Sequence, residues 1–267
     1  MNGSCSRCGR RARDAGPHAR RVCTAVSFAA LALLLLMPAP GRAQIGGDDF
    51  LCRPSPATVS LRGGYGIASA NSDLYDDATT LFTLEKSDFN AILFDADVGV
   101  RINDRFELVG GVTFGESSAR SEYRDWVDQD DLPIKQDTRL TRVPVIAGVR
   151  YYLVPRGRSI GRFAWIPAKW APYVGAGVGA VYYKYVQEGD FVDFVSLDVF
   201  PATIESSGWG RSGQLLGGVQ YSVSRRAALT AEARYVWASA DPDPVFSDLG
   251  RIDLGGMQTT VGLSFRF

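Results

Sequence analysis

The chain has 267 residues, long enough for one or two domains, and 46% of them are hydrophobic and 22% charged. Its 29 lysines and arginines balance 29 aspartates and glutamates. Residues 1–43 hold seven of the arginines and one of the aspartates, so 22 basic residues face 28 acidic ones in the remainder. A net charge of −6 argues against nucleic acid as a partner.

A secretory signal peptide is predicted at the N-terminus. Six arginines between Arg7 and Arg21 precede the apolar run Ala25–Met37, and the small residues Gly41 and Ala43 follow it. This is the order of a signal peptide, and the run is shorter than the roughly 20 apolar residues of a membrane-spanning helix. We expect residues 1–43 to be cleaved off, 44–56 to form a periplasmic N-terminal lead, and 57–267 to form the folded domain.

The mature chain keeps few reactive side chains. Cys5, Cys8 and Cys23 lie in the predicted signal peptide, as does the only histidine, His18. Cys52 remains, and one cysteine cannot form an internal disulfide.

Eight segments after residue 56 alternate between apolar and polar residues, which predicts half-exposed strands. They are Ala57–Ser69, Phe89–Ile102, Phe106–Ser118, Leu140–Leu153, Pro172–Val186, Ser212–Val223, Ala227–Trp237 and Leu254–Phe267. No segment shows a convincing helical period, so no helix is predicted.

The connections between the predicted strands also alternate. Asn103–Arg105 and Ser224–Arg226 read as tight turns, whereas the links after the first, third, fifth and seventh strands are long and polar. Long links at one rim and short turns at the other are the pattern of an up-and-down barrel. The basic, aromatic link Val154–Trp170 breaks this pattern, and we interpret it as an interfacial segment or an insertion.

The polar face of the strands indicates which side points into the barrel. It is rich in glycine and carries arginines and carboxylates without lysine: Arg62, Asp95, Asp97, Arg101, Glu107, Arg142, Arg150, Glu232, Arg234 and Arg266. The interior of an eight-stranded barrel is only just wide enough for its side chains, and arginine suits buried pairing with carboxylates. We therefore expect the polar face inside and the apolar face outside, the reverse of a soluble lipocalin-like barrel.

Three proximities follow within this interior set. Arg101 and Glu107 lie symmetrically about Asp104, so the hairpin predicts an ion pair between them. Arg62 lies on the strand beside Asp97 and within its reach. Glu232 and Arg234 share one face of the seventh strand. We expect the ten charged residues to form an internal network that plugs the barrel, meaning that side chains fill it.

The last strand keeps its alternation to the final residue. Val261, Leu263, Phe265 and Phe267 are apolar, and the residues between them are small or polar. In a closed barrel the last strand must pair with the first along its length, and aromatic girdles lie at the strand ends of membrane barrels.

Together with the signal peptide, the segments "PYVGAGVGA" (172–180), "LTAEARYVW" (229–237) and "GLSFRF" (262–267) make the chain resemble the small bacterial outer-membrane barrels of the OmpA/OmpX/OmpW type over Ala57–Phe267. The resemblance implies an all-β fold, an eight-stranded antiparallel up-and-down transmembrane β-barrel. It implies periplasmic termini and extracellular long loops. The implied partners are outer-membrane lipid, the barrel-assembly machinery, which reads Val261, Leu263, Phe265 and Phe267 as a folding signal, and periplasmic chaperones. We expect a monomer.

The expected function is a non-enzymatic outer-membrane barrel with a structural or surface-interaction role. The barrel enzymes we considered rely on a histidine base, and the mature chain has none. The acidic stretch Asp125–Asp131 lacks the spacing of a calcium loop, so neither a metal nor a cofactor is predicted.

The alternative is an OmpW-like passage for small apolar molecules, for which Leu93, Leu216 and Val181 would supply an apolar inner lining. The loop aromatics either contact partners or pack the loops together: Tyr75, Phe82, Trp126, Phe191, Phe194 and Phe200.

Overall fold

The computed structural model describes residues 54–128, 131–160, 164–192, 199–241 and 250–267. The predicted signal peptide, most of the N-terminal lead with Cys52, and Phe194 lie outside the described residues. Everything described belongs to one compact unit within Gly47–Phe267.

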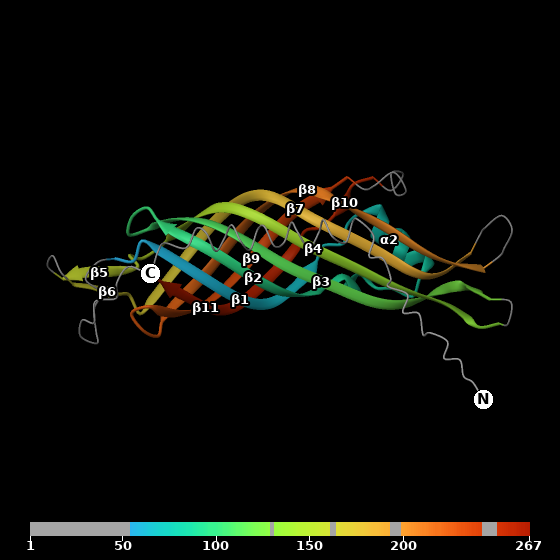
Figure 1. The fold of residues 1–267 in the computed structure, drawn as a ribbon, viewed down its shortest axis with the longest axis horizontal. Coiled ribbons are helices and arrows are strands. Elements are labelled where there is room, and N and C mark those ends of the chain that lie inside the picture. Colours follow the sequence, from blue (N-terminus) through green and yellow to red (C-terminus); the bar gives the residue numbers. More distant parts are fainter. Residues whose placement is uncertain (1–53, 129–130, 161–163, 193–198, 242–249) are drawn as a thin grey trace, which may run out of the picture. The chain divides into compact units, whose positions relative to one another are not determined.

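Eight strands close into an antiparallel barrel (Figure 1). They are β1 (Ala57–Ala68), β2 (Ala91–Arg101), β3 (Phe106–Val127), β4 (Pro133–Tyr152), β7 (Trp170–Val192), β8 (Val199–Ser222), β9 (Ala227–Ala240) and β11 (Gly256–Arg266). Each strand pairs with the next in this order, and β11 pairs with β1 from Arg266 opposite Thr58 to Gly256 opposite Ala68. The predicted eight-stranded up-and-down barrel is therefore confirmed. None of the described helices is long and apolar enough to cross a membrane.

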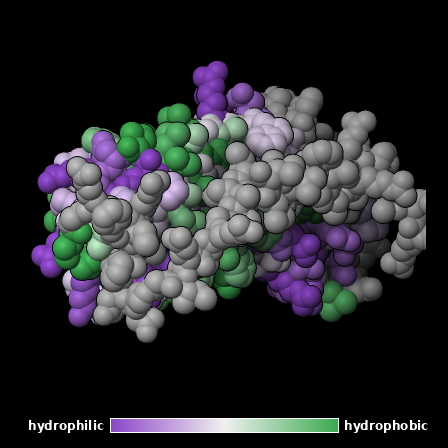
Figure 2. Space-filling model, turned by 60° about the vertical axis from the view of Figure 1, so that its left-hand side comes forward, coloured by the Kyte–Doolittle hydropathy of each residue, from purple (hydrophilic) through white to green (hydrophobic). Residues whose placement is uncertain are grey.

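The alternation along each strand separates an apolar outer face from a polar inner one, as predicted. In β2, Phe94 is 64% exposed, whereas Asp95 and Asp97 on either side of Ala96 are 5% and 2% exposed. Figure 2 shows hydrophobic residues gathered over the strands, with hydrophilic residues toward the ends. An apolar outer face of this kind is stable only in contact with lipid.

Four neighbouring strands are longer than predicted and about twice as long as the other four. β3, β4, β7 and β8 have 22, 20, 23 and 24 residues, whereas β1, β2, β9 and β11 have 12, 11, 14 and 11. A strand needs only about 9–11 residues to cross the membrane, so the longer strands continue as paired sheet beyond it. The prediction of a long irregular link between the third and fourth strands was wrong, because all but residues 128–132 of it is strand. The parts of these strands beyond the membrane need no apolar face. They therefore lack the alternation of apolar and polar residues that identified the membrane-spanning parts.

The link between β1 and β2 contains two helical segments that the sequence did not predict, α2 (Asp73–Leu81) and the 3-10 helix η1 (Lys86–Phe89). Only Leu74, Tyr75 and Ala78 of α2 are buried, too few to give a clear helical period. Asp73 and Asp76 in its first turn suit the positive end of the helix dipole. Tyr75 Oη donates a hydrogen bond to the carbonyl oxygen of Asp253 at 2.7 Å and fastens α2 beside the two-residue strand β10 (Ile252–Asp253).

The link between β4 and β7 folds into a small separate hairpin, β5 (Gly157–Ile160) paired with β6 (Ala164–Pro167). It lies at the same end of the barrel as the C-terminus (Figure 1). Trp165 of β6 is 2% exposed, and the guanidinium of Arg101 lies 5.3 Å from its ring centre. The backbone N–H of Ala168 donates to the carbonyl oxygen of Arg156, which fixes the base of the hairpin.

Glycines on the inner face make room for the large residues opposite them. A Cβ added to Gly218 would lie 2.6 Å from the Tyr173 ring, and one added to Gly99 would lie 2.5 Å from the Glu107 carboxyl carbon. At these two positions the interior has no room for an added methyl group.

Replacing Gly218 with valine should lower the free energy of unfolding by about 1–3 kcal/mol, the usual cost of overpacking. Urea titration of the protein refolded in vesicles measures this loss. Gly217→Val is the matched control, because the nearest atom to an added Cβ there is 4.0 Å away. Equal losses in the two variants would show that crowding at Tyr173 is not the cause.

Candidate functional site: an ionic network inside the barrel

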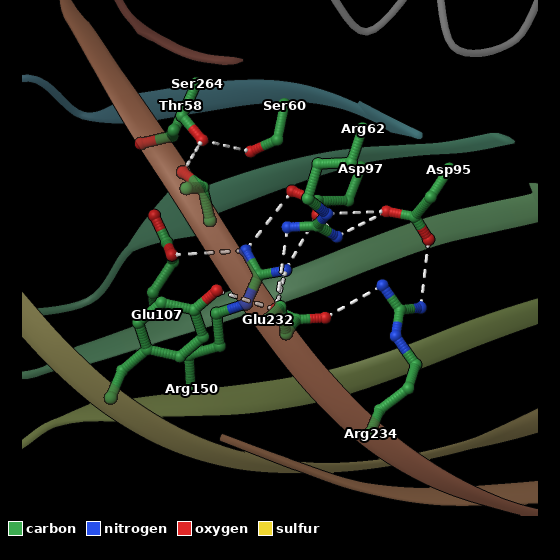
Figure 3. A network of polar contacts seen from close by, with 12 residues as sticks. Thr58, Ser60, Arg62, Asp95, Asp97, Glu107, Arg150, Glu232, Arg234 and Ser264 are labelled. Atoms are coloured by element: carbon green, nitrogen blue, oxygen red, sulfur yellow. Dashed lines mark hydrogen bonds and ion pairs between the residues drawn. The ribbon is translucent and has the colours of Figure 1, made fainter. Parts of the chain in front are cut away.

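The inner face of the barrel carries a connected set of ion pairs, which we call the ionic network (Figure 3). Its first part joins β1 to β2. Arg62 lies opposite Asp95 in the strand register, and its Nε donates to Asp95 Oδ2 at 2.9 Å. Its Nη2 donates to the carboxylates of both Asp95 and Asp97. Because residues two apart on a strand share a face, one arginine reaches both aspartates, including the predicted neighbour Asp97.

Arg150 on β4 carries the network across the barrel. It donates from Nη2 to Asp97 Oδ2 at 2.7 Å and to Glu232 Oε2 on β9 at 3.2 Å. Tyr173 Oη donates to the same oxygen of Glu232 at 2.7 Å. The network therefore links β2, β4 and β9, which are not neighbours in the ring, through side chains alone.

Arg234 closes the network on the β9 side. Its Nη1 donates to Asp95 Oδ1 at 2.9 Å, and its Nη2 lies 2.8 Å from Glu232 Oε1. Thr113 Oγ1 donates to Asp95 Oδ1 at 2.7 Å. The shared inner face of Glu232 and Arg234, expected from the alternation, thus brings the two side chains into contact.

Glu107 on β3 anchors the turn end of the network. Its side chain is 0% exposed; it accepts a hydrogen bond from Arg156 Nη1 at 2.7 Å and one from Tyr152 Oη at 2.9 Å. Arg150 Nη1 lies 3.8 Å away. Arg156 also donates to Thr58 Oγ1 at 2.9 Å, so the link before β5 is tied into the barrel interior.

The predicted ion pair between Arg101 and Glu107 is wrong. The two residues are opposite each other in the register, as expected, but Arg101 pairs with Asp104 in the turn and lies over Trp165. Arg156, which lies in the link between β4 and β7, pairs with Glu107 instead. The alternation within one hairpin cannot predict the contribution of Arg156, which lies 49 residues along the chain from Glu107.

Of the ten predicted interior residues, seven lie in the ionic network and three lie apart from it: Arg101, Arg142 and Arg266. Arg142 Nη2 donates to the carbonyl oxygen of Phe89 at 2.8 Å, and Arg266 Nη2 donates to Ser222 Oγ at 2.9 Å. The sequence reasoning missed Tyr152, Tyr173 and Arg156. The two tyrosines lie on inner-face positions of the alternation, which could have identified them, whereas Arg156 lies in a link without periodicity.

A small cavity of about 30 Å³ lies within the network and is lined by residues such as Arg62, Asp97, Arg150 and Gln214. It has room for two water molecules. The charged side chains of the network are at most 5% exposed, so the arrangement is suited to holding strands together. No group of three or more histidine, cysteine, aspartate or glutamate residues in the described part of the chain is placed to hold a metal ion.

The four apolar residues expected to form an assembly signal all face outward on or just after β11. Val261, Leu263, Phe265 and Phe267 are 62%, 43%, 39% and 60% exposed. The backbone N–H of Phe267 donates to the carbonyl oxygen of Ala57 at 3.0 Å, so pairing with the first strand reaches the last residue.

Among solved structures, the chain is similar to OprG from Pseudomonas aeruginosa, with 13% identity, a TM-score of 0.46, and coverage of 81% of this chain and 99% of that one. It is similar to Neisserial surface protein A at 15% identity and a TM-score of 0.43, covering 80% and 99%. The attachment invasion locus protein Ail of Yersinia pestis matches at 14% identity and 0.40, covering 79% and 99%.

At such identities the likeness concerns the fold alone. No curated protein matches the chain significantly. The model of the family described as "Outer membrane protein beta-barrel domain" matches residues 29–267. With the closed ring and its apolar outer face, this shows that the chain belongs to that family and is a transmembrane β-barrel protein of the bacterial outer membrane.

Proposed function

We propose that this protein is a non-enzymatic structural barrel with a surface-interaction role, and that its own side chains plug the interior. The ionic network carries the proposal: it connects β1, β2, β3, β4 and β9 through groups that are almost fully buried. A buried charge without a partner costs several kcal/mol, so these side chains are held in the lumen by one another and leave little space for ions to pass.

An apolar cluster supports the same proposal at the loop end. Tyr75 and Phe89 contact each other at 4.7 Å between ring centres, and Phe82 contacts Tyr123 at 4.6 Å. All four belong to one buried cluster with Val181 and Tyr183. Tyr75 and Phe82 thus support the packing alternative for the loop aromatics, whereas Phe200 is 46% exposed and available to a partner.

The surface-interaction role rests on the four long strands. β3, β4, β7 and β8 extend by about ten residues beyond what the membrane needs, which is roughly 30 Å of sheet. We assign these extensions and the loops to the extracellular side. The termini and the β5–β6 hairpin then face the periplasm, residues 1–43 are removed, and residues 44–56 form the lead.

For assembly, we propose that the mature chain is a monomer and reaches the membrane through periplasmic chaperones and the barrel-assembly machinery.

Enzymatic activity is not part of this proposal. The only histidine, His18, precedes residue 44, and the four network carboxylates are each held by arginine in the interior. They lack the access to substrate that acid–base catalysis needs.

The OmpW-like passage for small apolar molecules has less support. Leu93 and Val181 line a cavity of about 10 Å³, which has room for a single water molecule. Leu216 packs against the cluster of Tyr152, Ala171 and Tyr173.

Single-channel recordings of the purified protein in planar bilayers should show little or no steady conductance, because the lumen is filled. A trimeric porin inserted in the same bilayers is the control for insertion and sensitivity. A large, stable ion conductance would mean that the network lines a water-filled pore, and the proposed function would change from structural barrel to channel.

A further inference from the structure

The two ends of the barrel carry opposite charge. The three links at the turn end, residues 102–105, 153–169 and 223–226, contain seven lysines and arginines and one carboxylate, Asp104. The four links at the loop end, residues 69–90, 128–132, 193–198 and 241–255, contain fourteen carboxylates against Lys86 and Arg251. The positive charge of the turn end thus stands out in a mature chain whose net charge is negative.

Two of the turn-end cations contact aromatic side chains at the barrel's outer rim. Arg105 Nη1 donates to Tyr151 Oη at 3.0 Å, and the Tyr151 ring lies 4.9 Å from Phe106. Lys169 Nζ lies 5.8 Å from the centre of the Tyr221 ring, which contacts Trp170 at 4.7 Å. Such aromatic residues mark the membrane–water interface, so both cations lie at the level of lipid headgroups.

Three exposed cations of the turn end, Arg105, Lys169 and Arg226, have no carboxylate partner among the residues that the structure describes. In the described ranges, no carboxylate lies within 4.0 Å of the charged groups of Arg105, Lys169 or Arg226. Arg156 also lies at the turn end, but it is not available to bind an anion from outside, because its side chain points into the barrel and pairs with Glu107.

Three cations on the long strands differ, because each of them lies near a carboxylate. Lys184 lies 2.8 Å from Glu205 and Arg120 lies 3.0 Å from Asp137, and Arg139 lies 3.8 Å from Glu116. Arg105, Lys169 and Arg226 therefore present positive charge to their surroundings, whereas the charge of these three strand residues is balanced by a neighbouring carboxylate.

We propose that the turn end binds anionic phospholipids through Arg105, Lys169 and Arg226, which contact the headgroup phosphodiesters. Exposed apolar residues beside these cations contact the acyl chains: Ile102 is 63%, Leu153 50% and Val223 61% exposed. Cations next to an apolar, aromatic surface match a lipid that is anionic at one end and apolar at the other. Only the assignment of this lipid to the periplasmic leaflet rests on the orientation proposed above.

The test uses the full-length mature protein refolded into phosphatidylcholine vesicles that contain a minor fraction of lipid with brominated acyl chains. Trp209→Phe and Trp237→Phe remove the lipid-facing tryptophans at the loop end, so the exposed Trp170 reports on lipid at the turn end. Brominated phosphatidylglycerol should quench its fluorescence more than the same fraction of brominated phosphatidylcholine does. The excess should fall as salt is raised, because exposed charges are screened.

In this background, Arg105→Gln, Lys169→Gln and Arg226→Gln should each lower the preference for phosphatidylglycerol by roughly fivefold or less, and together they should abolish it. The control combines Arg120→Gln, Arg139→Gln and Lys184→Gln, which remove three paired cations, and it should leave the preference unchanged. Gel mobility of unheated samples verifies that every variant is folded.

Equal quenching by the two lipids in the parent protein would overturn the proposal, as would the same loss of preference in the control. Either result leaves the conductance measurement untouched, so failure here is distinguishable from failure of the plugged barrel.

Discussion

Replacing Glu107 with alanine should lower the free energy of unfolding by about 3–5 kcal/mol, the largest loss we expect from a single side chain. The Glu107 side chain is 0% exposed and pairs with Arg156 at 2.7 Å. Without the carboxylate, Arg156 is buried with no counter-ion and Tyr152 loses its acceptor. Urea titration in vesicles, followed by tryptophan fluorescence, measures the loss.

The matched control is Glu116→Ala on the outer face of the same strand. Glu116 lies 3.8 Å from Arg139 and both side chains are exposed, so the loss should stay below about 1 kcal/mol. A double-mutant cycle tests the partner: Glu107→Ala should couple to Arg156→Ala and add independently to Arg101→Ala. A loss for Glu107→Ala as small as the control's would contradict the buried pair.

Deleting Phe267 should strongly reduce the amount of barrel assembled in cells, with much less effect on refolding into detergent. Phe267 is 60% exposed toward lipid and its backbone pairs with Ala57 at the closure of the ring. Detergent solvates an exposed apolar residue as lipid does, so little folding energy is lost there. In cells, by our proposal, the assembly machinery reads this residue. Heat-modifiable gel mobility of membrane fractions and of refolded protein measures the two quantities.

Phe267→Leu, which keeps an apolar final residue, and Phe200→Ala, which removes an exposed aromatic at the loop end, serve as controls. Both should assemble better than the deletion. If the deletion assembles as well as the parent protein, the last residue is not the signal. If refolding fails to the same degree as assembly, its role is in stability.

Much of the architecture could be predicted from the sequence because strand alternation is a local property. The alternation of apolar and polar residues was enough to predict that Phe94 and Asp95 lie on opposite faces of their strand. The structure places them on the outer and inner faces. The tight turn Asn103–Arg105 and the alternation that runs to Phe267 likewise predicted the hairpin and the ring closure. Contacts between adjacent strands followed from the same reasoning, as Arg62 and Asp97 show.

Where the alternation of apolar and polar residues weakens, the sequence did not predict the secondary structure. The outer halves of β3, β4, β7 and β8 carry charged residues such as Arg120 and Lys184 on their exposed face, since they need no lipid contact there. The helix α2 buries only three side chains. In both cases backbone hydrogen bonds and neighbouring strands determine the structure, and neither leaves a strong pattern in the sequence.

The sequence by itself determined the fold class, the two faces of each strand and the set of charges that enters the barrel. Only the tertiary structure decided which of those charges pair, because the partners come from strands across the ring and from links without periodicity. Arg150 reaches Glu232 from 82 residues away, and Arg156 takes Glu107 while Arg101 turns to Asp104. In a narrow lumen each guanidinium competes with the others for four carboxylates. The outcome depends on distances that the barrel's closure sets, and these are not encoded in any one segment.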